Sequence, residues 1–186
     1  MPARTILDLA TDSRLIEPTA RLLLDAFRGR TEDWQDLDSA RQEVVESLTS
    51  ERISRVLLDE GGVVLGWIGG IPAYGGRVWE VHPLVVSGSH RRQGIGRALV
   101  EDLEGCAASR GALTLWVGSD DEHGDTTLSG PDLYSDIPGA IQRIRNLNHH
   151  PYEFYLRLGF TIAGVLPDAN GQGKPDIFLA KRVAIP

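Results

Sequence analysis

Two glycines lie among arginines in the run Arg91-Arg92-Gln93-Gly94-Ile95-Gly96-Arg97. An apolar segment precedes this run, and apolar residues at helical spacing follow it, so we expect a turn that opens a helix. The first N–H groups of a helix have no partner within it and carry a partial positive charge. Glycines let an anion approach them, and arginines add cationic donors. The run predicts a phosphate or pyrophosphate site; the alternative is an ordinary turn with a solvated basic cap.

Two common phosphate motifs do not fit this run. A P-loop needs a lysine followed by Ser or Thr, and the only Gly-Lys pair, Gly173-Lys174, is followed by Pro175. A dinucleotide fingerprint needs a third glycine where this chain has Leu99. The sequence therefore indicates a phosphate ligand that neither nucleotide motif describes.

A carboxylate and an imidazole alternate along the segment just before this run. Glu80, His82 and Leu84 are spaced by two residues, so on a strand we expect all three to face one side of the sheet. The pair Glu80 and His82 could bind an ammonium group and take its proton. The alternative is a solvated face on which the pair is incidental.

Six acidic residues and no Lys or Arg lie between Ser119 and Ile137. Carboxylates without a counter-charge repel one another unless cations satisfy them. The segment follows a predicted strand, at the end where α/β proteins commonly bind ligands. We expect it to favour a polycationic substrate; a solvated acidic loop or a calcium site is the alternative, although the spacing does not fit an EF-hand.

Hydrophobic periodicity and turn residues divide the chain into helices and strands. Helices are predicted over 12–28, 39–48, 94–109 and 151–158, and strands over 55–59, 63–71, 78–86, 113–117, 160–166 and 177–182. The strand–helix–strand unit around 94–109 predicts a crossover between parallel strands. The fold class is α/β (α+β mixed), with a central mixed sheet of about six to seven strands flanked by helices. No repeat or linker interrupts the pattern, so we expect one domain over residues 1–186.

The composition excludes several classes of protein. The formal net charge of -7 disfavours nucleic acid as a partner. No apolar run is long enough to span a membrane, and the first residues lack the apolar core of a signal peptide, so we expect a cytoplasmic protein. The single cysteine, Cys106, fits a reducing compartment and is expected in the core. His149 and His150 have no further ligand at metal spacing, so we predict no metal.

The pattern Arg91-x-x-Gly94-x-Gly96 resembles the coenzyme A-binding signature of the GNAT N-acetyltransferase superfamily. The run Tyr155-Leu156-Arg157-Leu158-Gly159-Phe160, with Asn148 seven residues before the tyrosine, is similar to a second segment of that family. The resemblance implies a GNAT fold with two splayed parallel strands that hold acetyl-CoA. Pro83, beside the predicted splay, is compatible with a break in the strand.

The resemblance also implies roles for individual residues. Pyrophosphate would be held by Arg91, Arg92, Gly94, Ile95 and Gly96, and pantetheine by the backbone of Leu84, Val85 and Val86 with Asn148. Tyr155 would protonate the leaving thiolate; the alternative is a core aromatic. Asn148 is equally compatible with a plain helix cap.

A narrower resemblance is to the aminoglycoside 6'-N-acetyltransferase branch of this superfamily. It rests on Trp79–Val86, on residues 118–121 and 125–129, and on three C-terminal runs: His150–Tyr155, Gly164–Gly171 and Lys174–Ile177. The branch implies direct attack by the substrate amine, Glu80 and His82 in the active site, and a homodimer. Substrate contacts are expected from Trp34, Trp79, Asp120 and Asp121; packing is the alternative for Trp34. Two functions remain open: acetylation of another amine, such as a polyamine or a protein N-terminus, and non-catalytic coenzyme A binding.

Overall fold

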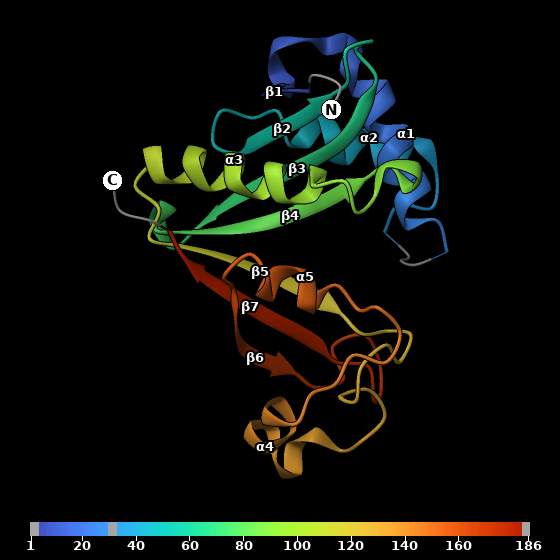
Figure 1. Cartoon of the computed structure of the whole chain (residues 1–186), viewed down its shortest axis with the longest axis vertical. Coiled ribbons are helices and arrows are strands. Elements are labelled where there is room, and N and C mark those ends of the chain that lie inside the picture. Colours follow the sequence, from blue (N-terminus) through green and yellow to red (C-terminus); the bar gives the residue numbers. More distant parts are fainter. Residues whose placement is uncertain (1–3, 30–32, 184–186) are drawn as a thin grey trace. The chain divides into compact units, whose positions relative to one another are not determined.

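The computed structural model describes residues 4–29 and 33–183, which group into two compact units. The first unit comprises the described residues up to Leu113 together with Val183, and the second comprises Thr114–Arg182. Figure 1 labels the elements of both. Whether residues 1–186 act as one domain stays a prediction.

The first unit is built on four antiparallel strands in sequence order. They are β1 (Thr5–Asp8), β2 (Ile53–Leu58), β3 (Val64–Ala73) and β4 (Val78–Val86). Asp59 closes the turn between β2 and β3, because its carboxylate accepts hydrogen bonds from the N–H groups of Gly61 and Val63 (both 2.9 Å). The β4 bounds agree with the predicted strand.

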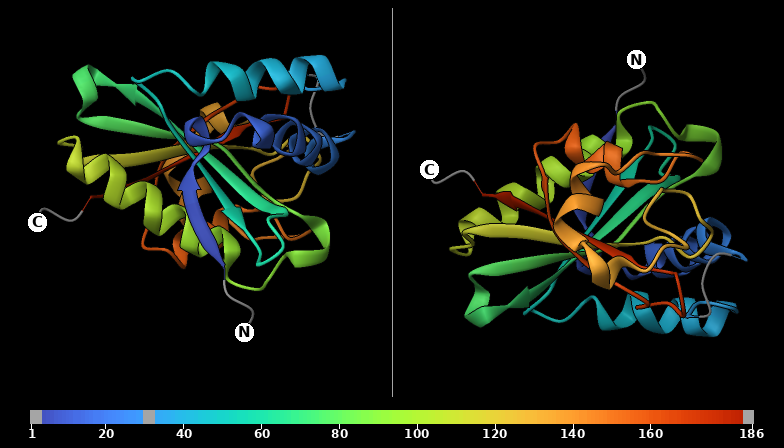
Figure 2. Two further views of the ribbon diagram at one scale, coloured as in Figure 1. Left: turned by 90° about the horizontal axis from the view of Figure 1, so that it is seen from above. Right: turned by 90° about the horizontal axis from the view of Figure 1, so that it is seen from below.

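Helices cover both faces of these strands (Figure 2). On one face lie α1 (Ile16–Phe27) and α2 (Leu37–Glu46), whose buried side chains share a core with Val56 and Trp67. On the other lies α3 (Ile95–Ser109): a Cβ on Gly66 would approach the α3 side chain of Leu99 to 2.8 Å. The small residues of β3 therefore let α3 approach the sheet closely.

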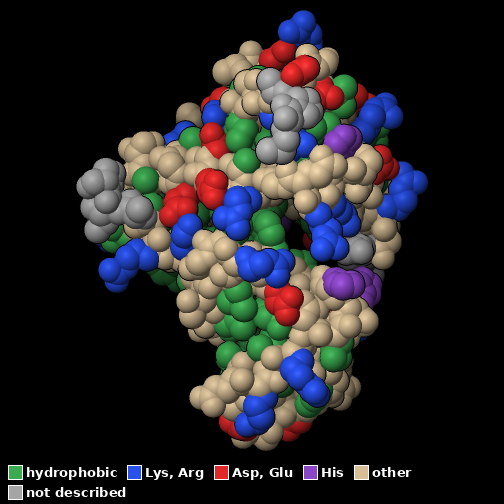
Figure 3. Space-filling model, in the orientation of Figure 1, with side chains coloured by type: hydrophobic (Ala, Val, Ile, Leu, Met, Phe, Trp, Pro, Cys, Tyr) green, Lys and Arg blue, Asp and Glu red, His purple; other side chains and the backbone are tan. Residues whose placement is uncertain are grey.

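An ion pair fastens α3 to β2. The Arg55 guanidinium donates to both carboxylate oxygens of Asp102, at 2.6 and 3.2 Å, and both side chains are largely shielded from solvent. Cys106 lies one turn further along α3 and is half-buried, as its predicted place near the core requires. Figure 3 shows acidic and basic side chains next to one another on one face of the molecule. In α3, Arg97 pairs with Glu101 at 3.5 Å.

The second unit is a three-stranded antiparallel sheet in the order β5 (Thr114–Asp120), β7 (Asp176–Arg182) and β6 (Thr161–Leu166). Two short helices accompany it, α4 (Ile137–Gln142) and α5 (Tyr152–Leu156). The long segment between β5 and α5 contains α4 and a 3-10 turn (Leu133–Ser135), neither of which is among the predicted elements.

Seven strands with these helices confirm the predicted mixed α/β fold class. Sequence patterns missed β1, which has four residues and no apolar alternation. The two strands expected to splay apart, β4 and β5, belong one to each unit, so the splay stays a prediction. Within the described ranges no helix is both long enough and apolar enough to cross a bilayer.

Candidate active site

A bulge in β4 decides which side chains share a face. Where β3 has one residue, Gly69, β4 has two, His82 and Pro83. An extra residue in one strand moves every later side chain to the opposite face of the sheet. Glu80 and His82 therefore face α1 and α2 together, as predicted, whereas Leu84 faces α3. The expectation that Leu84 shares their face was wrong, because it assumed an unbroken alternation.

Side-chain contacts agree with these two faces. The His82 ring lies 5.8 Å from the ring of Trp34, in the segment before α2. Trp79 lies on the other face: a Cβ on Gly70 would be 2.8 Å from the Leu103 side chain of α3 and 3.3 Å from the Trp79 ring. Trp79 is 2 % exposed and donates to the Gly76 carbonyl at 2.9 Å. The structure thus gives Trp79 a packing role, away from the Glu80 face.

The bulge requires a glycine on β3. A Cβ on Gly69 would overlap the carbonyl oxygen of His82, and backbone cannot move aside as the end of a flexible side chain does. Any other residue would push β4 away from β3 where Glu80 and His82 lie. The position of this pair is consequently set by backbone geometry rather than by side-chain bonds.

A cavity of about 310 Å³ opens beside His82. It is lined by Asp33, Trp34, Ser39, Gln42, Glu43, Glu46 and His82. Several carboxylates, an indole and an imidazole therefore surround one hollow of the first unit. Such a lining suits a cation that also carries apolar surface, because carboxylates attract ammonium groups and an indole face stabilises them.

The half-buried Glu80 is poised to accept a proton. Burial raises the pKa of its carboxyl above the ordinary value, and the nearby His82 opposes this shift. A higher pKa makes the ionised carboxylate a stronger base. That Glu80 removes a proton from an amine stays a prediction.

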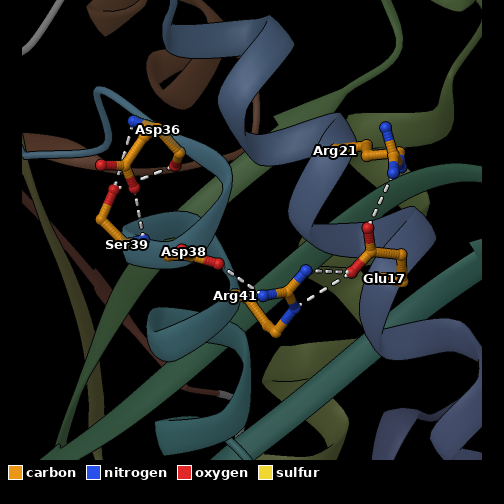
Figure 4. A network of polar contacts seen from close by, with 6 residues as sticks. All are labelled: Glu17, Arg21, Asp36, Asp38, Ser39 and Arg41. Carbon is orange, nitrogen blue, oxygen red and sulfur yellow. Dashed lines mark hydrogen bonds and ion pairs between the residues drawn. The ribbon is translucent and has the colours of Figure 1, made fainter.

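An ion-pair network fixes α2, and with it the Trp34 segment, to α1 (Figure 4). Glu17 of α1 accepts from both Nε and Nη2 of Arg41 in α2, at 3.0 and 2.7 Å, and from Arg21 at 2.8 Å. Asp36 caps α2 by accepting from the N–H of Ser39 at 2.8 Å. This clamp holds Trp34, which is 8 % exposed and also packs on Phe27.

The predicted anion site lies at the start of α3. Gly94 adopts φ 81°, a left-handed conformation that favours glycine, and no side chain caps the helix. The first bond back to Gly94 comes from Ala98 (3.0 Å), so the N–H groups of Ile95, Gly96 and Arg97 have no partner within the helix. The neighbouring Arg91 and Arg92 are exposed. N–H groups without a partner inside the helix and two exposed arginines thus lie in one short segment; that they hold a phosphate stays a prediction.

A residue that sequence patterns missed supports this turn. Arg4, just before β1, donates to the carbonyl oxygen of Gln93 (2.9 Å) and to its side-chain oxygen (2.8 Å). Gln93 in turn donates to the Ser89 carbonyl at 3.3 Å. Nothing in the spacing of residues 89 positions apart could have revealed the contact.

In the second unit Tyr155 lies in α5. Its side chain is 7 % exposed and packs edge-on against Phe154 and Phe160. Burial raises the pKa of its hydroxyl well above the ordinary value, so the hydroxyl keeps its proton. That it gives this proton to a leaving thiolate stays a prediction. Asn148 is exposed, and its N–H donates to the Asp125 carbonyl at 3.2 Å.

The acidic segment after β5 bonds largely to itself. Asp121 is 1 % exposed, and its carboxylate accepts from the N–H groups of Asp125 and Thr126 and from the Thr126 hydroxyl, at 2.6 to 3.1 Å. Asp132 caps the 3-10 turn, and Asp136 caps α4 and pairs with Arg143. Backbone N–H groups, a hydroxyl and an arginine thus satisfy these three carboxylates, and that the segment favours a polycationic substrate stays a prediction. Asp120 is exposed and accepts from Asn170.

No group of three His, Cys, Asp or Glu side chains among the described residues could hold a metal ion.

The chain is similar to proteins of known family and structure. Residues 16–124 match the model of the acetyltransferase (GNAT) family. The chain is similar to a crystal structure of an aminoglycoside 6'-N-acetyltransferase complexed with coenzyme A, with 41% identity, 97% of each chain covered and a TM-score of 0.90. It is also similar to the aminoglycoside 6'-N-acetyltransferase from Enterococcus faecium, with 42% identity, 98% and 97% coverage and a TM-score of 0.88. An aminoglycoside 6'-acetyltransferase type Ii matches at 36% identity, 97% of each chain and a TM-score of 0.75. A search of curated proteins finds no match.

Proposed function

Because the chain belongs to the GNAT family of acetyltransferases, we propose that it transfers the acetyl group of acetyl-CoA to the 6'-amine of aminoglycoside antibiotics and so confers resistance. The observation that carries the proposal is the cavity beside His82, in which Glu43 and Glu46 lie with Trp34. An aminoglycoside is a polycation with apolar ring edges, which matches that lining. Two similar proteins with full-length coverage carry this activity in their names.

The proposed reaction is direct attack of the amine on the thioester carbonyl. The nitrogen lone pair forms the C–N bond, the carbonyl oxygen carries negative charge in the tetrahedral intermediate, and the C–S bond then breaks. Glu80, with His82 beside it, takes the proton from the ammonium group, directly or through water. A backbone N–H of Leu84 or Val85 stabilises the oxyanion, and Tyr155 gives its proton to the leaving thiolate. The second proton, which the nitrogen loses as the intermediate collapses, replaces the one that Tyr155 gave.

The cofactor half of the proposal uses the start of α3. The N–H groups of Ile95, Gly96 and Arg97 lack partners within the helix, and Arg91 and Arg92 supply positive charge. These groups would hold the coenzyme A pyrophosphate, while the backbone of Leu84–Val86 and the side chain of Asn148 would contact pantetheine. Millimolar coenzyme A should raise the melting temperature of the protein. An unchanged melting temperature would contradict the proposed coenzyme A site.

On the acceptor side, the proposal relies on Trp34 and on Asp120, the exposed acid at the end of β5. Asp121 supports the loop that follows Asp120 and is not proposed to touch substrate. We further propose that the protein is cytoplasmic and a homodimer, as the family resemblance implies. Light scattering coupled to size exclusion would test the oligomeric state.

An acceptor panel tests the function as a whole. Thiol release from acetyl-CoA is measured with kanamycin-type aminoglycosides, with analogues that lack the 6'-amine, with polyamines and with peptides. We expect turnover only where the 6'-amine is present. Activity confined to polyamines or peptides would replace the substrate class, and coenzyme A binding without any turnover would leave a binding module.

A further inference from the structure

His150 is a buried histidine that the proposed reaction does not use. Its side chain is 2 % exposed, and its backbone exchanges two hydrogen bonds with the side chain of Asn146, at 2.8 and 2.9 Å. Both ring nitrogens are also engaged: Nδ1 with the N–H of Tyr152 at 3.2 Å, and Nε2 with the carbonyl oxygen of Asp120 at 3.0 Å. Every polar atom of this residue therefore has a partner in the second unit.

These partners determine where the ring hydrogen lies. A backbone N–H can only donate, so Nδ1 must accept from Tyr152 and carries no hydrogen. A carbonyl oxygen can only accept, so Nε2 carries the hydrogen and donates to Asp120. The imidazole is therefore held neutral, as a rigid link with one acceptor end and one donor end.

The link joins two proposed parts of the active site. Asp120 is the last residue of β5 and the proposed acceptor-binding acid, and Asn170 holds its carboxylate from the other side at 2.9 Å. Tyr152 is the first residue of α5, which also carries Tyr155. Since α5 has five residues, an N–H bond at its first residue orients the whole helix.

We propose that His150 is a positioning residue for acetyl transfer, whose Nε2–H tautomer sets Asp120 and Tyr155 relative to each other without contacting substrate. This inference rests on the proposed function. The two ring nitrogens of His150 serve different steps. Nε2 orients Asp120, which binds the acceptor, and Nδ1 orients α5, whose Tyr155 protonates the thiolate. Removal of one end should therefore disturb one kinetic parameter more than the other.

Two substitutions separate these ends. In His150→Asn the side-chain oxygen can still accept from Tyr152, but nothing reaches Asp120. In His150→Gln the side-chain amide can still donate to Asp120, but nothing accepts from Tyr152. Misplacement of a reacting group by about 1 Å can cost on the order of a hundredfold. We expect His150→Asn to raise the acceptor KM and His150→Gln to lower kcat, each by about tenfold to a hundredfold.

Measurements are made below the melting temperature of each variant, with His123→Gln as the control, since His123 is an exposed histidine of the same segment. Three results would overturn the positioning role and leave the proposed function intact. They are equal effects of both variants on the acceptor KM and kcat, a higher KM in His150→Gln with a lower kcat in His150→Asn, and wild-type kinetics in both variants. A wild-type chain inactive toward every amine would overturn the proposed function and the positioning role with it. Nitrogen NMR of the wild-type His150 ring gives an independent answer. A hydrogen on Nδ1 would contradict the proposal, whereas a hydrogen on Nε2 and none on Nδ1 would support it.

Discussion

Carboxylates behave differently in the two units. In the first unit Glu80 is half-buried beside His82, and burial raises the pKa of its carboxyl. In the second unit Asp121 is almost fully buried, yet backbone N–H groups and a hydroxyl satisfy it. The comparison teaches that acid count does not locate a cation site. Where the fold already supplies a buried carboxylate with several donors, as it does for Asp121, the acid serves the structure of its loop.

The strongest test of this difference is Glu80→Gln. Loss of a general base typically costs 10² to 10⁴ in rate, so kcat/KM should fall by about that factor while coenzyme A affinity stays unchanged. Steady-state kinetics with an aminoglycoside, together with calorimetry for coenzyme A, provide the check. Wild-type kinetics would remove Glu80 from the reaction.

Tyr155→Phe tests a buried hydroxyl of the second unit, to which we assign a part in the reaction, against the buried but structural Asp121. The substitution removes only the hydroxyl and leaves the ring contacts with Phe154 and Phe160. We expect kcat to fall by about 10² or more, with a much smaller change in acetyl-CoA binding. Equal losses in turnover and binding would argue that the hydroxyl positions the cofactor instead.

Asp121→Ala tests the structural acid. Three donors would lose their charged partner, which should lower the free energy of unfolding by about 3 kcal/mol and the melting temperature by about 6 to 12 °C. The acceptor KM of the folded variant should stay close to the wild-type value. Glu122→Gln, which removes the same charge from the next position, is the control. A higher acceptor KM with an unchanged melting temperature would indicate that Asp121 binds the acceptor instead of stabilising its loop.

Trp34→Ala probes the cavity wall of the first unit. A cation–π contact adds about 0.5 to 1 kcal/mol at an exposed site, so we expect the acceptor KM to rise by about two- to fivefold, and Trp34→Phe to restore most of it. A fall in the melting temperature of Trp34→Ala without a change in KM would leave Trp34 as a packing residue between Phe27 and His82.

The smallest expected effect concerns stability. A carboxyl whose folded-state pKa is raised stabilises the fold while protonated, and this stability is lost as the pH rises through that pKa. Above that pKa Glu80 is ionised in a half-buried place, so at neutral pH Glu80→Gln should melt higher than wild type. The difference should vanish toward about pH 4, near the ordinary pKa of glutamate. A lower melting temperature at neutral pH would contradict the sign.

Local patterns predicted most elements and the start of α3, because helix periodicity, glycines and arginines act over a few residues. The same patterns placed Leu84 with Glu80 and missed the bulge, since the extra residue shows only in pairing with β3. They also treated the acids after β5 as unpaired, although Asp132 and Asp136 stand directly before short helical turns that they cap. Contacts such as Arg4 with Gln93 depend on tertiary structure and leave no local trace.

The β4 bulge has a consequence for how this chain can vary in length. Removal of one residue at His82 or Pro83 would restore simple alternation and exchange the two sides of the strand. With β3 and the end of β4 fixed, the Trp79 indole would move to the face covered by α1 and α2, and the Glu80 carboxylate to the face covered by α3. Substitutions along β4 can therefore be explored one at a time, whereas a single deletion there would invert half the strand at once.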